Sequence, residues 1–167
     1  MNNAIVDVFE PHNEPTRGYL PGSPERTELE AELERQSGET IEIPLVINGR
    51  EVFTGTTVPV VMPHDHRHVL AHCHQAREED VQAAIRAALD AREAWLTTSW
   101  VERASVFLKI AELLSKKYRA RINAATMLGQ GKNAFQSEID AACESIDFLR
   151  YNTYFAAQIY NQQPRSD

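Results

Sequence analysis

The sequence is poor in the features that define several common classes of protein. It has two cysteines, Cys73 and Cys143, in 167 residues, which is typical of a reducing compartment and too few for a disulfide scaffold. No apolar run approaches the roughly 18 residues of a membrane helix, so we expect no membrane partner. The N-terminus has no signal pattern, and its acidic residues disfavour a mitochondrial transit peptide. These observations predict a cytoplasmic protein, or one of the mitochondrial matrix if the source is eukaryotic.

Basic residues are scarce in the N-terminal quarter of the sequence, which carries all of the net negative charge. The net charge is −7, and residues 1–42 contain ten acidic and three basic residues, whereas the other 125 residues contain 14 of each. Nucleic-acid binding needs a basic footprint, so no nucleic-acid partner is expected. The shift in composition predicts an acidic N-terminal extension with one helix over residues 1–42, followed by a second unit over 43–167. A small basic cluster is interpreted as the solvated side of a helix (Lys116, Lys117, Arg119, Arg121).

Turn and capping signals predict one N-terminal helix, then small strands, then several helices. Residues 1–22, rich in proline, glycine and asparagine, should lack regular structure; Ser23, Pro24 and Gly38 then delimit a helix. The pair Asn48-Gly49 predicts a hairpin, and "VPVVMP" and "HVLAHCHQA" predict two strands joined by a turn at "PHDHRH". From "REEDVQAAIRAALDAREAW" onward, apolar residues recur with the 3.6-residue period of an α-helix. Further signals are a capping box at Ser99 and Glu102, helix breaks at Gly129 and Gly131, and a last long helix over "QSEIDAACESIDFLRYNTYFAAQIY".

Five of the six histidines lie at even positions within "HDHRHVLAHCH", so one face of a strand could carry all five. A zinc site needs three or four converging ligands, and ligands in a row along a strand spread too far apart to supply them. No second cluster of ligands is present. We therefore predict no metal site, and interpret the segment as a solvent-facing edge hairpin.

The last long helix carries an acidic stripe and one cysteine. Asp140, Glu144, Asp147 and Tyr151 follow helical spacing along one side, and such a stripe is ordinarily hydrated. The alternative is that one of its carboxylates faces a cleft and binds an ammonium group. Cys143 has acidic neighbours, which raise a thiol pKa, so it is interpreted as a packing residue rather than a nucleophile. No glycine-rich phosphate loop follows a strand, and the residues alone predict no catalytic centre.

Two stretches, "LVINGREVFTG…DVQAAIRAALDAREAW" and "ER....LK.AELL" (Glu102 to Leu114), resemble the aldehyde dehydrogenase family. "EPTRGYLPGSPER", "NAATMLGQGKN", "SEIDAACESIDFLRYN" and "NQQPRSD" resemble its 1-pyrroline-5-carboxylate dehydrogenase branch. The resemblance runs from about Glu14 to Asp167. It implies an α/β, aldehyde dehydrogenase-like fold, of which this chain is the N-terminal, helix-rich part of the NAD-binding domain with a small antiparallel β-hairpin unit.

The resemblance also implies an activity for the parent enzyme, the NAD-dependent oxidation of L-glutamate γ-semialdehyde to L-glutamate in proline catabolism. In that family a cysteine thiolate attacks the aldehyde, an oxyanion hole stabilises the adduct, and NAD accepts a hydride. Those residues lie further along the family's chain, and neither cysteine of this sequence corresponds to the nucleophile. The 167 residues are therefore expected to be a fragment with no catalytic, cofactor-binding or metal-binding residue. The parent is expected to be a homo-oligomer acting on a small molecule.

One substrate-binding residue is implied by the resemblance. The glutamate of the step "AACE" faces the aldehyde site in this branch and helps to bind the substrate's α-amino group, which assigns that role to Glu144. Asp140 and Asp147 inherit no such role and are expected to face solvent. Two alternatives stay open: a non-catalytic helical interaction module derived from the family, and a metal-binding protein that uses the histidine run.

Overall fold

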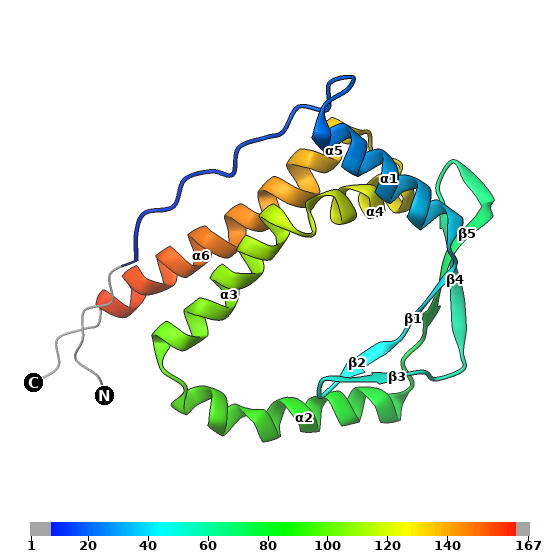
Figure 1. The fold of residues 1–167 in the computed structure, drawn as a ribbon. Coiled ribbons are helices and arrows are strands. Elements are labelled where there is room, and N and C mark those ends of the chain that lie inside the picture. Colours follow the sequence, from blue (N-terminus) through cyan, green and yellow to red (C-terminus); the bar gives the residue numbers. More distant parts are fainter. Residues whose placement is uncertain (1–7, 163–167) are drawn as a thin grey trace, which may run out of the picture.

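The computed structural model describes residues 8–162 as helices and short strands that follow one another around an open centre (Figure 1). Helix α1 comes first, the strands lie between α1 and α2, and the remaining helices complete the ring. The elements are α1 (Pro24–Gly38), β1 (Ile41–Ile43), β2 (Leu45–Ile47), β3 (Arg50–Val52), β4 (Thr57–Met62), β5 (Asp65–His74), α2 (Glu78–Thr97), α3 (Trp100–Lys116), α4 (Arg119–Gln130), α5 (Ala134–Ser137), the π-helical turn η1 (Glu138–Cys143) and α6 (Glu144–Asn161).

The strands form a three-stranded mixed sheet and a separate hairpin. β5 is the central strand, parallel to β1 and antiparallel to β4. The histidine segment is therefore not an edge hairpin as predicted, because β1 covers the free side of β5. The turn is also shorter than expected, since β5 already begins at Asp65. The β2–β3 hairpin is confirmed, with Asn48 and Gly49 at φ values of 51° and 71°.

The hydrophobic core lies where α3, α4 and the α5–α6 helix meet. Ala111, Ala142 and Ile146 are fully buried there, and Leu114, Ile122 and Leu149 pack around them. Small alanines at the helix contacts let the helices approach closely, while Ile146 fills the space between them. This core fixes the position of the N-terminal part of α6. None of the helices within residues 8–162 is long and apolar enough to cross a membrane.

The predicted helix signals are mostly confirmed. The hydroxyl of Ser23 accepts the Arg26 N–H, which caps α1. Ser99 and Glu102 exchange the two hydrogen bonds of a capping box at the start of α3. The predicted break at Gly131 is confirmed, since its φ of 67° is accessible to glycine at little cost, but the break at Gly129 is wrong because that residue lies inside α4.

Helix α2 carries an apolar side that the described residues leave uncovered. Val81 and Ile85 are each 48% exposed and Leu89 is 62% exposed. The helix approaches the sheet region mainly at β2, where Leu45, Ile47 and Val81 border a shallow groove. The amphipathic pattern of the sequence is thus present, but its apolar side stays about half exposed among the described residues.

The segment before α1 has no helix or strand between residues 8 and 20, as predicted, but it runs alongside α6 (Figure 1). Asn13, Glu14 and Tyr19 reach the helices through their side chains. Residues 13–19, which we call the N-terminal strap, therefore pack as part of the helical unit.

Candidate functional site

Glu144, the predicted substrate-binding residue, lies at the start of α6 on the rim of a hollow of about 490 Å³. Its side chain is exposed, and among residues 8–162 nothing donates a hydrogen bond or forms an ion pair to its carboxylate. The hollow combines this carboxylate with three aromatic rings. Its lining residues are Asn13, Glu144, Asp147, Phe148, Tyr151, Asn152 and Phe155.

The other members of the acidic stripe are engaged by neighbouring residues. Asp147, expected to face solvent, is half-buried and accepts the Glu14 N–H at 2.7 Å and the Asn13 amide at 2.9 Å. The Asp140 carboxylate lies 2.9 Å from the Lys132 ammonium group. Tyr151 donates to the Asn13 side-chain carbonyl at 3.1 Å. Glu144 is therefore the carboxylate of the stripe that stays available to a ligand.

A buried ion cluster beneath this surface was not predicted. Arg119 is 2% exposed and Glu138 is fully buried, so placing Arg119 on a solvated helix side was wrong. The guanidinium forms an ion pair with Glu138 and a second one with Glu14 of the strap. Arg119 also donates to the Pro15 carbonyl at 2.8 Å. The sequence did contain a signal for this burial. Arg119 lies three residues before Ile122, on the side of α4 that faces the core.

Glu138 has hydrogen-bond donors on every side. Tyr19 donates to one carboxylate oxygen at 2.7 Å and Asn123 to the same oxygen at 2.8 Å, while the Arg17 N–H reaches the other at 2.7 Å. Burial alone raises the pKa of this carboxyl, but the hydrogen bonds from Arg119 and Tyr19 outweigh burial and lower the pKa to about 2. Glu138 is therefore a permanently ionised structural anchor at neutral pH.

Cys143 packs against the same cluster, as its interpretation as a packing residue predicts. It is 6% exposed, and its sulfur lies 3.4 Å from an Arg119 guanidinium nitrogen. Burial and the negative charge of Glu138 raise the pKa of the thiol to about 11. A protonated, enclosed thiol is a poor nucleophile at neutral pH.

Two histidines of the histidine segment, His68 and His74, make contacts that stabilise the fold. His74 is buried; one ring nitrogen lies 3.1 Å from the Glu42 carboxylate, and the other accepts the Gly55 N–H at 3.2 Å. His68 lies 2.8 Å from the Ser37 carbonyl. Within residues 8–162, no three His, Cys, Asp or Glu side chains are grouped so that they could hold a metal ion.

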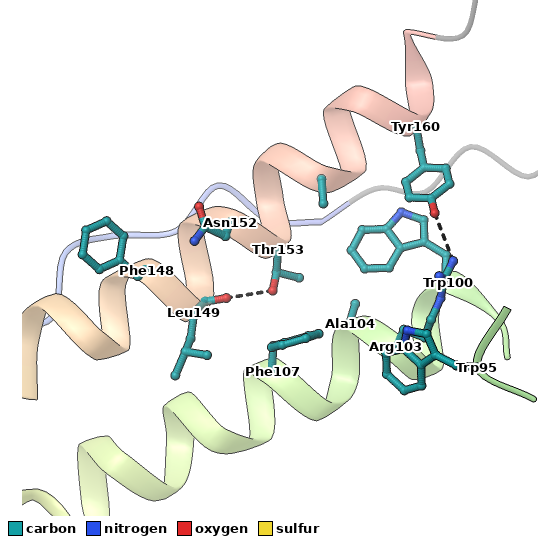
Figure 2. A pocket seen from close by; sticks show the side chains of 11 residues that line it. Trp95, Trp100, Arg103, Ala104, Phe107, Phe148, Leu149, Asn152, Thr153 and Tyr160 are labelled. Carbon is teal, nitrogen blue, oxygen red and sulfur yellow. Dashed lines mark hydrogen bonds between the residues drawn. The ribbon is translucent and has the colours of Figure 1, made fainter. Parts of the chain in front are cut away.

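A second hollow, of about 420 Å³, lies between α3 and α6 (Figure 2). Figure 2 shows Leu149 extending from α6 toward α3, and the Arg103 guanidinium bonded to the Tyr160 hydroxyl at 3.0 Å. Phe148 and Asn152 border both hollows. The two hollows therefore lie on adjacent sides of α6, and this second one is lined mainly by aromatic and aliphatic side chains.

Comparison with known proteins gives the class of this protein. The sequence model of the aldehyde dehydrogenase family matches residues 52–167, so the chain belongs to that family. Two similar relatives are the delta-1-pyrroline-5-carboxylate dehydrogenase of Agaricus bisporus, 49% identical over 153 residues (91% of this chain, 28% of that protein), and the mitochondrial enzyme of that name from Homo sapiens, 43% identical over 154 residues (92% and 27%).

Solved structures agree with this assignment. The delta-pyrroline-5-carboxylate dehydrogenase of Mycobacterium tuberculosis, solved with bound NAD, superposes with a TM-score of 0.94 at 46% identity, over 99% of this chain and 31% of its own. This chain thus has the aldehyde dehydrogenase-like fold predicted from its sequence. It spans less than a third of the length of these relatives, and several eukaryotic relatives are named mitochondrial.

Proposed function

We propose that this chain is the N-terminal portion of an NAD-dependent dehydrogenase that oxidises L-glutamate γ-semialdehyde, the open form of 1-pyrroline-5-carboxylate, to L-glutamate. Sequence identity of 43–49% to enzymes with that name supports this proposal. The observation specific to the site is the unpaired, exposed carboxylate of Glu144. Within this proposal, residues 43–167 are the first part of the NAD-binding domain and residues 1–42 an acidic extension.

The chemistry of the hollow suits an α-ammonium group. A carboxylate gives a charge-assisted hydrogen bond to an ammonium, and that bond is worth about 1.5–3 kcal/mol. The neighbouring rings of Phe148 and Tyr151 present π faces, which attract cations. Asp147 already accepts one hydrogen bond from the strap on each of its oxygens, whereas the Glu144 carboxylate accepts none from residues 8–162. The role of Glu144 is therefore to bind and orient the amino end of the substrate while the aldehyde reacts elsewhere.

We assign no site for NAD to residues 8–162. In dinucleotide-binding folds, a glycine-rich turn between a strand and a helix binds the phosphates of the cofactor. Within residues 8–162 the connection from a strand to a helix is Gln75–Arg77, between β5 and α2, and it contains no glycine. We therefore assign no cofactor contact and no catalytic step to these residues, and place both in the remainder of the enzyme.

The uncovered side of α2 fits the same proposal, because further chain or another subunit of a homo-oligomer would bury Val81, Ile85 and Leu89. We place the enzyme in the cytoplasm, or in the mitochondrial matrix if the source is eukaryotic, since eukaryotic relatives are named mitochondrial.

The test is substrate discrimination by the full-length protein that contains this chain. Glu144→Gln should lower kcat/KM for L-glutamate γ-semialdehyde by roughly tenfold to a hundredfold, because it removes the charge that binds the ammonium. For 5-oxopentanoate, which is the same aldehyde without the amino group, kcat/KM should stay within about twofold. Equal losses with both substrates would reject amino-group recognition by Glu144.

A further inference from the structure

The helix that carries Glu144 is not a regular α-helix. α5, η1 and α6 follow one another without a break from Ala134 to Asn161, and η1 has π-helical hydrogen bonding. Glu144 itself closes this turn, because its N–H donates to the Ile139 carbonyl five residues earlier. A regular α-helix would pair that N–H with the residue four earlier. One extra residue in a helix of 3.6 residues per turn rotates everything after it by about 100°. The direction of the Glu144 side chain therefore depends on the π turn.

The buried ion cluster holds both ends of that turn. Glu138 is its first residue and Cys143 its last, and Arg119 of α4 contacts both side chains. In a regular α-helix, residues five apart point about 140° away from each other. A single guanidinium could not then reach both side chains from one side. The contacts that Arg119 makes are thus compatible with the π turn and would be lost if it relaxed to an α-helical turn.

The N-terminal strap completes the anchor. Glu138 also accepts hydrogen bonds from the Tyr19 hydroxyl and the Arg17 N–H of the strap and from Asn123 of α4. Four groups from two other parts of the chain therefore fix one carboxylate inside the molecule. Since π turns are rare and recur at functional sites, an anchor of this strength is expected to serve the residue that the turn directs.

We propose that Glu138, held by Arg119, is a positioning residue for Glu144 and sets the direction of its carboxylate through the π turn between them. The proposal rests on the role of Glu144 proposed above. Glu138 touches no substrate; it acts by keeping the extra residue of the turn in place. Loss of the anchor should therefore weaken recognition of the amino group and leave the rest of the reaction intact.

The experiment is a double-mutant cycle in the full-length enzyme. Glu138→Gln should lower kcat/KM for L-glutamate γ-semialdehyde roughly tenfold through a higher KM, since a misplaced binding group costs affinity for the group it binds. It should leave kcat/KM for 5-oxopentanoate within about twofold. Added to Glu144→Gln, it should cause no further loss of kcat/KM for L-glutamate γ-semialdehyde. The matched control is Asp140→Asn, which removes a charge from the same turn at an exposed ion pair with Lys132 and should leave both substrates unchanged.

Three results separate the possibilities. Equal losses on both substrates, or a loss that persists undiminished in the Glu144→Gln background, would overturn the positioning role while leaving the Glu144 proposal standing. If Glu144→Gln alone has no amino-selective effect, the proposed function of Glu144 fails first. If Glu138→Gln does not fold, Tyr19→Phe tests the proposal, because it removes one 2.7 Å hydrogen bond to Glu138. It should lower kcat/KM for L-glutamate γ-semialdehyde about threefold and spare 5-oxopentanoate. A Tyr19→Phe variant that does not discriminate between the two substrates would equally reject the proposal.

Discussion

Replacing Arg119 by methionine should loosen the N-terminal strap and the π turn together. The change keeps much of the side-chain volume but leaves Glu138 buried without its guanidinium partner. Removing one partner of a buried ion pair typically costs about 3–5 kcal/mol. The lower end applies here, because Tyr19, Asn123 and the Arg17 N–H still donate to Glu138, and Arg150 still pairs with Glu14. We expect a local loss of about 3 kcal/mol.

Amide hydrogen exchange, followed by mass spectrometry on the full-length protein, measures this loss where it occurs. A change of about 3 kcal/mol corresponds to roughly hundredfold faster exchange, since each factor of ten is worth about 1.4 kcal/mol. The faster exchange should appear in peptides that cover residues 13–19 and 138–143. The matched control is Lys109→Met, which breaks an exposed pair with Glu112. Such a pair is worth under about 1 kcal/mol.

The difference between Arg119→Met and the wild type should also depend on pH. The pKa of Glu138 is about 2 in the folded protein, against an ordinary value of 4.5. Because the folded-state pKa is lowered, the ionised Glu138 contributes fully to stability above about pH 4.5, and this contribution is lost as the pH falls toward about 2. The ratio of exchange rates between variant and wild type should therefore shrink as the pH falls from about 4.5 toward about 2. An exchange increase below about threefold in both peptides at neutral pH would refute the reasoning.

Two further predictions concern the 167 residues by themselves. Mixed with NAD⁺ and L-glutamate γ-semialdehyde, the isolated chain should give no NADH above background in an absorbance assay, because the thiol of Cys143 is buried and protonated; turnover that disappears in Cys143→Ser would contradict this. The isolated chain should also self-associate, because α2 exposes an apolar side. Leu89→Glu should shift it toward the monomer in sedimentation velocity, whereas a wild-type chain that is already a sharp-melting monomer would refute this prediction.

Local signals in the sequence predicted most of the elements. Caps, turns and the 3.6-residue period depend on residues a few positions apart, so Ser23, the Asn48-Gly49 turn and the capping box at Ser99 could be identified without knowing the fold. The aldehyde dehydrogenase resemblance also came from contiguous stretches. The position of Gly129 was misjudged because a glycine is tolerated inside a helix at a modest cost, and the turn is made two residues later by Gly131.

What the sequence could not indicate depends on contacts between separate elements, from 19 positions apart for Arg119 and Glu138 to 133 for Glu14 and Asp147. Arg119 reads as a solvated cation beside Lys116 and Lys117, and only the packing of α4 against the strap and η1 places it between Glu14 and Glu138. The same strap occupies Asp147 and leaves Glu144 as the free carboxylate of a stripe whose members look alike in sequence. The π turn is likewise invisible to helical periodicity, because its extra residue is stabilised by a guanidinium from another helix. The sequence by itself determined the elements and the family, since those follow from short-range patterns; the tertiary structure alone decided which charges are buried, because burial depends on long-range contacts.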